Sequence, residues 1–384
     1  MKILQICPKF HPSIASGSTK IAYNISKELA RRGHSVTVYT SDMKDKYTRI
    51  NNGIERIDGI SVHRFQSIGT FATREIKFFI IPKIIPTLKN EVGSFDIVHI
   101  HESRSFQNIF AYHYTKKYDI PYVLQAHGTI TENGRRNGIK WLYDVLFGYK
   151  ILRAASKTIA LNRTETEHYK KAGVVENKIE IIPNGINPSE YRLPPKGEFK
   201  TKYEIGNDEK VVLYLGRIHR SKGIDLLINS FAILEKIINN VKLALVGPDD
   251  GFLKEALQLS KKLRSKILFT GFVSEEEKLK ALVDADVLVI PSFYGFPITF
   301  LEACIAGVPI VTTSIGDNLS WIDGKVGFIR PPTSKDLSEG IYQILTNKKI
   351  YEKFSRNCKN IVHKEFSIDK ITSKLENLYR SIIH

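Results

Sequence analysis

Short apolar runs alternate with helix-like patterns along the whole chain. Residues 2–7 form an apolar run that predicts a strand, and Ile21, Ile25 and Leu29 then recur at helical spacing before Gly33 ends the helix. Similar runs predict further short strands in the first half of the chain, at residues 36–38, 97–100, 122–125 and 158–160.

The second half repeats this alternation more clearly. A predicted strand over 211–215 is followed by a helix with Leu227, Phe231 and Leu234 on one face. Further strands are predicted at residues 242–246, 267–270, 287–290 and 309–312. This alternation predicts an α/β protein with parallel sheets and helices on both faces. Two such doubly wound, Rossmann-like domains would face each other across a cleft, where ligands usually bind.

The length of 384 residues is enough for two domains, each with its own core. Pro183-Asn184-Gly185 interrupts the pattern between the two halves, and residues 194–197 have the composition of a linker. We therefore predict an N-terminal domain over 1–193 and a C-terminal domain over 194–364. A helix over 365–384 is expected to pack back on the N-terminal domain.

Composition narrows the class of protein. The chain is 42% hydrophobic and 25% charged, which is typical of globular proteins, and no apolar run approaches the ~20 residues of a transmembrane helix. The N-terminus is expected to form a core strand rather than a signal peptide. Three scattered cysteines do not make a disulfide framework or a zinc site. We therefore expect a cytoplasmic protein.

The net charge of +17 is concentrated in the first half of the chain, where 29 lysines and arginines up to Arg192 stand against 17 acidic residues. A basic surface attracts phosphates, whether in nucleic acid, anionic lipid or a phosphorylated ligand. The alternative is an ordinary solvated basic surface. The charge alone does not separate these interpretations.

A basic motif, Gly216-Arg217-Ile218-His219-Arg220-Ser221-Lys222-Gly223, connects a predicted strand to a helix. In doubly wound sheets, ligands bind outside the carboxyl ends of the strands, and a helix N-terminus favours an anion. Arg217 offers a planar set of donors and Lys222 a compact charge, so together they could neutralise two phosphates. A solvated basic turn is the alternative.

A second strand-to-helix connection spans Pro291 to Ala303. The amides of Ile298 and Thr299 would be first-turn donors available to an anion. Glu302 lies about one turn further along, where its carboxylate could accept hydrogen bonds from ribose hydroxyls. The alternative for Glu302 is an acid on the helix surface.

Taken together, these two motifs resemble, in order and spacing, the signatures of the retaining GT-B glycosyltransferases of family 4. The resemblance extends to Ile182-Pro183-Asn184-Gly185-Ile186, Gln125-Ala126-His127-Gly128 and Asp96-Ile97-Val98-His99, and so covers nearly the whole chain. It implies a GT-B fold with an acceptor-side N-terminal domain and a donor-binding C-terminal domain.

The resemblance also implies roles for individual residues. Arg217 and Lys222 match the pair that binds the donor diphosphate, Glu302 the residue that binds the ribose, and His127 the histidine beside the donor sugar. The other donor-binding positions that it implies are Gly17, Tyr294, Gly295, Ile298 and Thr299. Tyr294 stands where the family has its first glutamate, or that glutamate is deleted in this chain. Ser16 stands where relatives often have glycine.

The implied reaction transfers a sugar from a UDP- or GDP-sugar to a glycan or lipid-linked acceptor with retention and without a required metal or other cofactor. Cations at the diphosphate would lower the barrier because negative charge develops there in the transition state. Asp284-Ala285-Asp286 has the spacing of a metal motif, but it lies at a helix end before a strand, so we do not expect a metal there.

Other interpretations remain open at this stage. One is a sugar-nucleotide epimerase or hydrolase on the same fold, and another is a non-catalytic protein that binds anions or nucleic acid, although the best-organised motif lies in the less basic half. An apolar stripe at Leu142, Val145, Leu146, Tyr149 and Leu152 follows Arg135-Arg136 in the chain. Basic residues border the stripe: Lys140, Lys150, Arg153 and Lys157. The stripe is expected to pack inward, with an anionic membrane surface as the alternative, which Phe78–Ile81 would support.

Overall fold

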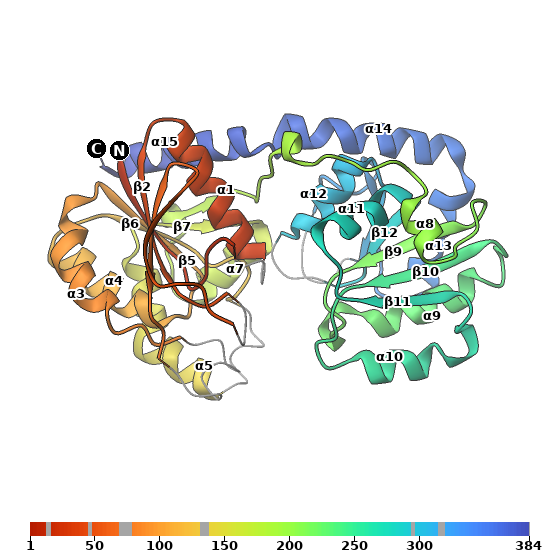
Figure 1. The fold of residues 1–384 in the computed structure, drawn as a ribbon, viewed down its shortest axis with the longest axis horizontal. Coiled ribbons are helices and arrows are strands. Elements are labelled where there is room, and N and C mark those ends of the chain that lie inside the picture. Colours follow the sequence, from red (N-terminus) through yellow and green to blue (C-terminus); the bar gives the residue numbers. More distant parts are fainter. Residues whose placement is uncertain are drawn as a thin grey trace. The chain divides into compact units, whose positions relative to one another are not determined.

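The computed structural model describes residues 1–12, 17–44, 48–68, 79–130, 138–292, 296–313 and 319–383. The chain forms two compact units (Figure 1). Unit 1 comprises Met1–Ile186 together with the C-terminal segment from Ile368, and unit 2 comprises Asn187–Ser367. The polypeptide therefore leaves unit 1, builds all of unit 2 and returns.

Unit 1 is built on an eight-stranded sheet with the order β3-β4-β2-β1-β5-β6-β7-β8. Every neighbouring pair is parallel except β3 and β4, which form an antiparallel hairpin at one edge. The strands are β1 (Lys2–Ile6), β2 (Ser35–Ser41), β3 (Gly53–Ile57), β4 (Ile60–Phe65), β5 (Ile97–His101), β6 (Tyr122–Gln125), β7 (Lys157–Ala160) and β8 (Ile179–Ile181). The predicted parallel sheet is confirmed.

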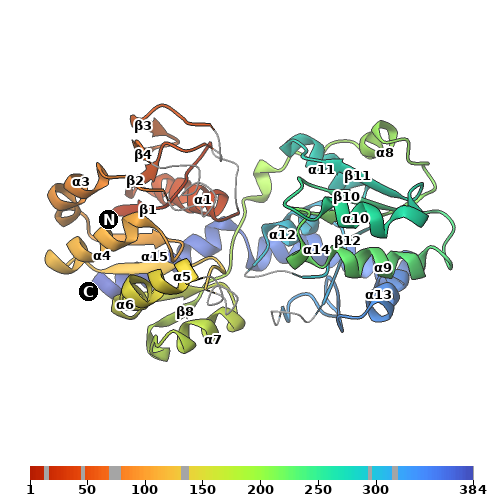
Figure 2. The same cartoon turned by 90° about the horizontal axis from the view of Figure 1, so that it is seen from below.

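Helices cover both faces of this sheet (Figures 1 and 2). On one face, Leu4, Ile6 and the matching positions of the neighbouring strands pack against α3 (Ile84–Glu91), α4 (Phe106–Lys117), α6 (Tyr149–Ala154) and α7 (Arg163–Lys171). Because successive side chains of a strand alternate, Ile3 and Gln5 point to the opposite face. That face carries α1 (Gly17–Arg31) and α15 (Ile368–Ile383), and Tyr379 of α15 contacts His99 of β5.

The C-terminal helix is fixed to unit 1 by ion pairs as well as by its buried apolar side. Arg32 at the end of α1 pairs with Glu376 and, at 2.7 Å, with Asp369. His34 lies 2.6 Å from a carboxylate oxygen of Glu376. These contacts join the first and last helices of the chain.

Unit 2 is built on a six-stranded parallel sheet with the order β11-β10-β9-β12-β13-β14. Numbered within the unit, this is the 3-2-1-4-5-6 order of a Rossmann sheet. The strands are β9 (Lys210–Leu215), β10 (Val241–Val246), β11 (Ile267–Gly271), β12 (Val287–Ile290), β13 (Ile310–Thr313) and β14 (Gly327–Arg330). Its helices are α8 (Glu198–Lys202), α9 (Ile224–Leu234), α10 (Leu253–Leu259), α11 (Glu275–Asp284), α12 (Ile298–Ala306), α13 (Ser334–Thr346) and α14 (Lys348–Glu365).

The unit boundaries differ by a few residues from the predicted 193/194 and 364/365. The first boundary falls at Ile186–Asn187, because the following segment is already hydrogen-bonded within unit 2. The hydroxyl of Tyr191 donates to Glu302, and the amide of Gly197 donates to Asp284. The second boundary falls after Ser367, because α14 runs to Glu365 before the chain returns to unit 1.

The expectation that the apolar stripe packs inward is wrong for its first half. Residues 138–154 form a continuous helical segment, consisting of α5 (Gly138–Tyr143), a π-helical turn (Asp144–Gly148) and α6. Ile151 and Leu152 of α6 are buried, but six large apolar side chains before them are 38% to 62% exposed: Ile139, Trp141, Leu142, Val145, Leu146 and Phe147. We call these six residues the apolar helical surface. Phe79 and Ile81 are buried in unit 1 and cannot extend it; Phe78, Arg135 and Arg136 lie outside the described residues.

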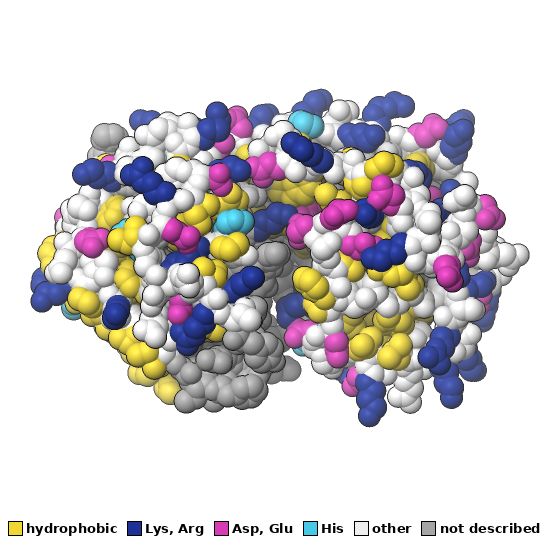
Figure 3. Space-filling view, in the orientation of Figure 1, with side chains coloured by type: hydrophobic (Ala, Val, Ile, Leu, Met, Phe, Trp, Pro, Cys, Tyr) yellow, Lys and Arg dark blue, Asp and Glu magenta, His cyan; other side chains and the backbone are white. Residues whose placement is uncertain are grey.

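On the face shown in Figure 3, lysine and arginine side chains are interspersed with aspartate and glutamate and do not form one continuous basic patch. Among the described residues on this side, such a distribution gives no extended groove of one sign for a nucleic-acid backbone.

Candidate active site

The order of the strands in the unit 2 sheet reverses between β9 and β12. This switch point brings the two predicted motifs together. Strands β9 and β12 are neighbours, and the chain leaves them toward α9 and α12 on opposite sides of the strand order. The basic motif follows β9 and the second motif follows β12. In doubly wound sheets this carboxyl-end crevice is where a phosphate-containing ligand binds.

Residues 216–223, which we call the basic loop, carry two cations with different surroundings. Arg217 is half exposed and forms an ion pair with Asp250. Lys222 is less exposed, and burial together with the nearby Arg217 charge lowers the pKa of its ammonium group, whereas Asp250 opposes this shift. A desolvated ammonium beside a second cation gains most from a bound anion.

The basic loop is held by the loop after β10, which the sequence analysis did not identify. The amide of Ile218 donates to the carbonyl of Pro248 at 2.9 Å, and the amide of Asp250 returns a bond to Ile218 at 3.0 Å. The two backbones approach so closely that a Cβ atom on Gly247 would lie 1.9 Å from the carbonyl oxygen of Gly216. Gly247 therefore lets the second loop support the first.

The N-terminus of α12 faces the same end of the sheet. Pro297 precedes the helix, and its side chain makes no capping hydrogen bond. The first helical residues, Ile298 and Thr299, supply amides that an anion could bind. Tyr294 and Gly295 lie outside the described residues.

Glu302 is buried, with 3% exposure, so the alternative of a helix-surface acid is wrong. One of its carboxylate oxygens lies 2.9 Å from the ammonium group of Lys278 on α11 and 3.2 Å from the hydroxyl of Tyr191. A buried carboxylate needs such partners, because an unpaired charge is costly to bury. Lys278 and Tyr191 lie 24 and 111 residues from Glu302, which is why local motifs did not reveal them.

In unit 1, His127 follows β6 at the carboxyl end of the sheet. Its φ of +54° is in the left-handed region, which is rare for a residue other than glycine and is often found at functional sites. Its Nε2 atom lies 2.9 Å from Nδ1 of His101, and their rings are stacked. Burial lowers the pKa of His127 to about 3, so the imidazole is neutral at physiological pH.

Gly17 is the first residue of α1, directly after the loop that leaves β1 at the switch point of unit 1. The next residue, Ser18, donates a 2.7 Å hydrogen bond to the carboxylate of Glu102, which follows the neighbouring strand β5 and also has a left-handed φ of +67°. Glu102 was not identified from the sequence. Ser16 lies outside the described residues.

The Asp284-Ala285-Asp286 motif has a structural role. Asp284 accepts bonds from the amides of Gly197, Phe199 and Lys200, which start α8. Asp286 accepts a 2.8 Å bond from the amide of Val211 at the start of β9. Both carboxylates therefore fix backbone at the amino end of the sheet.

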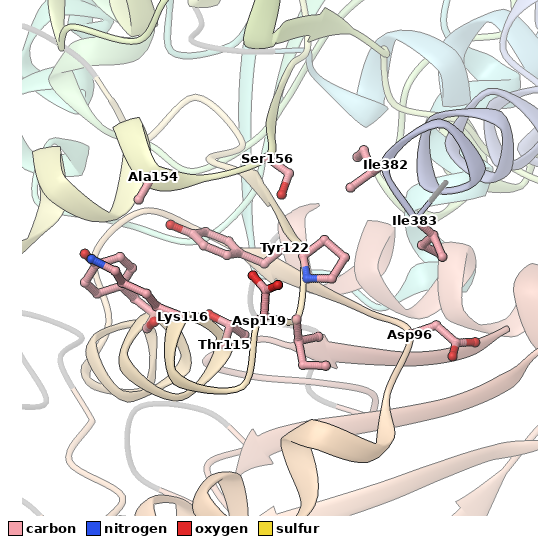
Figure 4. Close-up of a pocket in the computed structure, with 12 residues that line it drawn as sticks. Asp96, Thr115, Lys116, Asp119, Tyr122, Ala154, Ser156, Ile382 and Ile383 are labelled. Carbon is pink, nitrogen blue, oxygen red and sulfur yellow. Dashed lines mark hydrogen bonds between the residues drawn. The ribbon is translucent and has the colours of Figure 1, made fainter.

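A cavity of about 480 Å³ lies in unit 1, lined by Asp96, Tyr122, Ser156 and Ile382 among others (Figure 4). Asp96 precedes β5, Tyr122 begins β6 and Ser156 precedes β7, so this cavity is at the amino ends of the strands. Ligands of parallel sheets bind at the carboxyl ends. It is therefore separate from the residues considered above.

Within the described ranges, no helix of the chain is long and apolar enough to cross a membrane.

Comparison with known proteins gives a consistent result for both halves of the chain. The family described as Glycosyltransferase Family 4 matches residues 15–190, and Glycosyl transferases group 1 matches residues 195–361. The chain is 29% identical to an uncharacterized glycosyltransferase of Methanocaldococcus jannaschii, over 99% of this chain and 98% of the relative. It is 26% identical to an Escherichia coli UDP-Gal:alpha-D-GlcNAc-diphosphoundecaprenol alpha-1,3-galactosyltransferase, over 77% of each chain.

Among solved structures, the sucrose-phosphate synthase of Thermosynechococcus elongatus superimposes with a TM-score of 0.80 at 20% identity, over 99% of this chain and 98% of that one. This similarity shows the fold. Both halves match glycosyltransferase families, and the order of strands and helices is that of two Rossmann-like units. The chain therefore belongs to the group 1, family 4 glycosyltransferases of the GT-B fold.

Proposed function

We propose that this protein moves a sugar, with retention of its anomeric configuration, from a UDP- or GDP-sugar to a glycan or lipid-linked acceptor. Arg217 and Lys222 would bind the donor diphosphate. The observation that carries this proposal is the pair of cations in the basic loop at the switch point of unit 2. The galactosyltransferase relative, which by its name uses UDP-Gal and a diphosphoundecaprenol-linked acceptor, supports it.

The chemistry of the bond explains why two cations would serve here. Breaking the anomeric C–O bond places negative charge on the departing diphosphate, and fixed positive charges stabilise that charge more in the transition state than in the ground state. A diphosphate would also relieve the unfavourable proximity of Lys222 to Arg217, which together with burial lowers the Lys222 pKa. We propose that amides of Ile298 and Thr299 add donors and that Glu302 accepts from the ribose hydroxyls.

For the retaining step, we propose front-face displacement with His127 of unit 1 beside the donor sugar. The acceptor hydroxyl forms the new bond to the anomeric carbon on the side from which the diphosphate leaves, and a diphosphate oxygen takes the acceptor's proton. Double displacement would instead need a carboxylate nucleophile. Glu302 is already engaged by Lys278 and Tyr191, which favours the first route. Inversion of the anomeric configuration in the product, measured by NMR, would contradict it.

We also propose that transfer needs no metal ion. Arg217 and Lys222 would supply the positive charge that a divalent cation otherwise brings to a diphosphate. Transfer should then persist in the presence of EDTA. Loss of transfer in EDTA with recovery on adding Mg²⁺ or Mn²⁺ would contradict this part of the proposal.

The central experiment compares cations of the basic loop. The donor is first chosen by thermal shift against UDP- and GDP-sugars, because a ligand of the native state raises its apparent stability. Arg217→Ala and Lys222→Ala should each reduce transfer about 100-fold or more, in line with the loss of a transition-state charge contact. Arg220→Ala is the matched control, since Arg220 is in the same loop but pairs with Glu255 and lies over the Phe252 ring. Equal transfer rates in all three variants would refute the diphosphate site, and donor turnover without acceptor would instead indicate a hydrolase or epimerase.

We propose, in addition, that the apolar helical surface of unit 1 binds an anionic membrane. Its segment is firmly attached from behind, because Asp144 forms two bonds of 2.7 and 2.8 Å with Arg104, and the Tyr143 hydroxyl donates to a backbone carbonyl. The apolar side chains are thus presented outward by an anchored helix, with exposed Lys140 and Lys150 in the same segment. Apolar side chains with flanking cations suit an anionic bilayer surface.

Vesicle binding tests this surface. Trp141 is exposed whereas Trp321 is buried, so a blue shift of tryptophan fluorescence with phosphatidylglycerol vesicles would report insertion of this segment. Leu142→Ser combined with Leu146→Ser should abolish co-flotation with these vesicles. Phe272→Ser, at an exposed apolar residue of unit 2, is the control and should leave flotation unchanged. Dimerisation through the same residues, or equal flotation of both variants, would contradict the membrane assignment.

A further inference from the structure

A buried row of polar side chains crosses the middle of the unit 1 sheet and ends at His127. The side chains of Gln5 on β1 and His101 on β5 are 0% and 1% exposed. Oε1 of Gln5 lies 2.6 Å from Nε2 of His101. The other ring nitrogen of His101, Nδ1, lies 2.9 Å from Nε2 of His127. Three side chains from β1, β5 and the loop after β6 are therefore joined in one chain of hydrogen bonds.

The chemistry of the three side chains determines which atom donates and which accepts in each of these hydrogen bonds. The amide oxygen of Gln5 can only accept, so Nε2 of His101 carries the proton and donates. A neutral imidazole has one donor and one acceptor, so Nδ1 of His101 accepts from Nε2–H of His127. Nδ1 of His127 is then left with a lone pair. Among the described residues, no group bonds to this buried atom.

Both imidazoles are neutral, as this direction requires. Burial lowers the pKa of His127 to about 3. Burial, followed by the neighbouring His99 and His127, also lowers the pKa of His101 well below its usual value. The cause in each case is the cost of placing a cation in the sheet interior.

We propose that Gln5 and His101 are positioning residues that fix the tautomer of His127, so that its Nδ1 atom presents a lone pair to a hydroxyl group of the donor sugar. This inference rests on the proposed function, because it places the donor sugar at His127. With the tautomer fixed, His127 accepts a hydrogen bond from the sugar without adding a positive charge. Such a charge would oppose the positive charge that develops on the sugar as the diphosphate leaves.

The neighbouring His99 provides a matched control. It lies on the same strand face, its ring stacks on that of His101 at 4.1 Å, and its Nδ1 atom bonds to the hydroxyl of Tyr379. Phenylalanine at either position keeps a stacked ring. His101→Phe breaks the chain of hydrogen bonds to His127, whereas His99→Phe removes the contacts of His99 with Tyr379 and Gln125 and leaves that chain intact.

The tautomer is measured directly by ¹⁵N NMR of histidine-labelled full-length protein at pH 7.5, with His127→Asn used to assign the signals. We expect a protonated Nε2 and an unprotonated Nδ1 for His127 in the wild type and in His99→Phe. In His101→Phe, both ring nitrogens should show averaged signals of a tautomer mixture. Gln5→Met is a second test if His101→Phe fails to fold, because it removes the acceptor that orients His101, together with the Gln5 contact to Tyr379, and keeps the His101 ring. A proton on Nδ1 of wild-type His127 would overturn the proposal. An unchanged His127 tautomer in His101→Phe and Gln5→Met would also overturn it.

Kinetics connect the tautomer to the reaction. With the nucleotide-sugar that gives the largest thermal shift, and GlcNAc-diphosphoundecaprenol as the acceptor probe, His101→Phe should lower kcat about 10-fold (~1.4 kcal/mol). The KM for the donor should change by less than about 2-fold, because the diphosphate contacts are untouched. Equal kcat losses in His99→Phe and His101→Phe would indicate that His101 has a purely structural role and would refute its positioning of His127. If the protein shows the expected tautomers but no sugar transfer with any donor, the proposed function fails while the tautomer assignment stands.

Discussion

Mild acid should destabilise unit 1 through three histidines, of which His99 and His101 are buried and His127 is partly buried. Burial lowers the pKa values of His99 and His127 to about 3 and lowers that of His101 well below its usual value. In the unfolded chain, the pKa of each histidine is about 6.5. Below pH 6.5 the unfolded state therefore binds more protons than the folded state, and stability is lost as the pH falls toward the folded pKa.

The size of this effect follows from the pKa difference. Each histidine costs about 1.4 kcal/mol per pH unit once the pH is below its unfolded pKa. Between pH 6.5 and 5, this amounts to roughly 1.5–2 kcal/mol for one histidine and about 5 kcal/mol for all three. A loss of that size is a large fraction of the stability of an ordinary domain, about 5–15 kcal/mol.

The assay is urea unfolding at pH 7.5, 6.5, 5.5 and 5.0. Unfolding is monitored by hydrogen exchange of amides in β1, β5 and β6, so that unit 1 is observed separately. His11 and His63 also have pKa values lowered by burial and contribute in the same direction. The comparison with His99→Phe isolates the cluster. This variant should lose about 1.5–2 kcal/mol less than the wild type over the same interval. Parallel stability curves for the two proteins would refute the assignment of neutral, buried histidines.

Three further predictions concern unit 2. Gly247→Ala should weaken nucleotide binding about 10-fold or more, because its Cβ would lie 1.9 Å from a carbonyl oxygen of the basic loop; Gly251→Ala, at a residue that also has a positive φ but nothing within 4 Å, should bind normally by calorimetry. Lys278→Met should reduce the free energy of unfolding by about 3 kcal/mol by removing the ammonium group that pairs with the buried Glu302 carboxylate, and adding Glu302→Gln should recover much of that loss. Asp284→Ala should cost about 1–2 kcal/mol in a urea titration by removing the cap of α8, with no change when metal is added; a metal-dependent stability of the wild type would contradict the capping role.

The sequence predicted best those strands that are buried on both faces. In β12 all four residues, Val287–Ile290, are apolar and buried, so its pattern identifies a central parallel strand. The hairpin of β3 and β4 was not predicted, because β3 is largely exposed and carries no apolar run. Its two-residue turn, Asp58-Gly59, has positive φ at both positions, and Asp-Gly between two short strands is a hairpin signal that could have revealed it.

At the site, the motifs within one strand-to-helix connection could be recognised, whereas contacts between distant segments could not. Arg217 and Lys222 belong to one loop, so their spacing was visible in the chain. The shared face of His99 and His101 followed from strand alternation. Their different partners could not be predicted, since Tyr379 and Gln5 come from the two ends of the chain and meet only when α15 and β1 are in place.

The return of the chain to unit 1 has a consequence for synthesis. Unit 2 is a continuous segment, Asn187–Ser367, and holds all six strands of its sheet, so it can fold as soon as it leaves the ribosome. Unit 1 has all eight strands by Ile186 but must wait for α15, which is made only after unit 2, to cover Gln5, His99 and the end of α1. During that interval His99 lacks the Tyr379 hydroxyl, and Arg32 lacks Glu376 and Asp369 although it keeps its ion pair with Glu28. A chain truncated before α15 should therefore yield a folded second unit and an incomplete first unit.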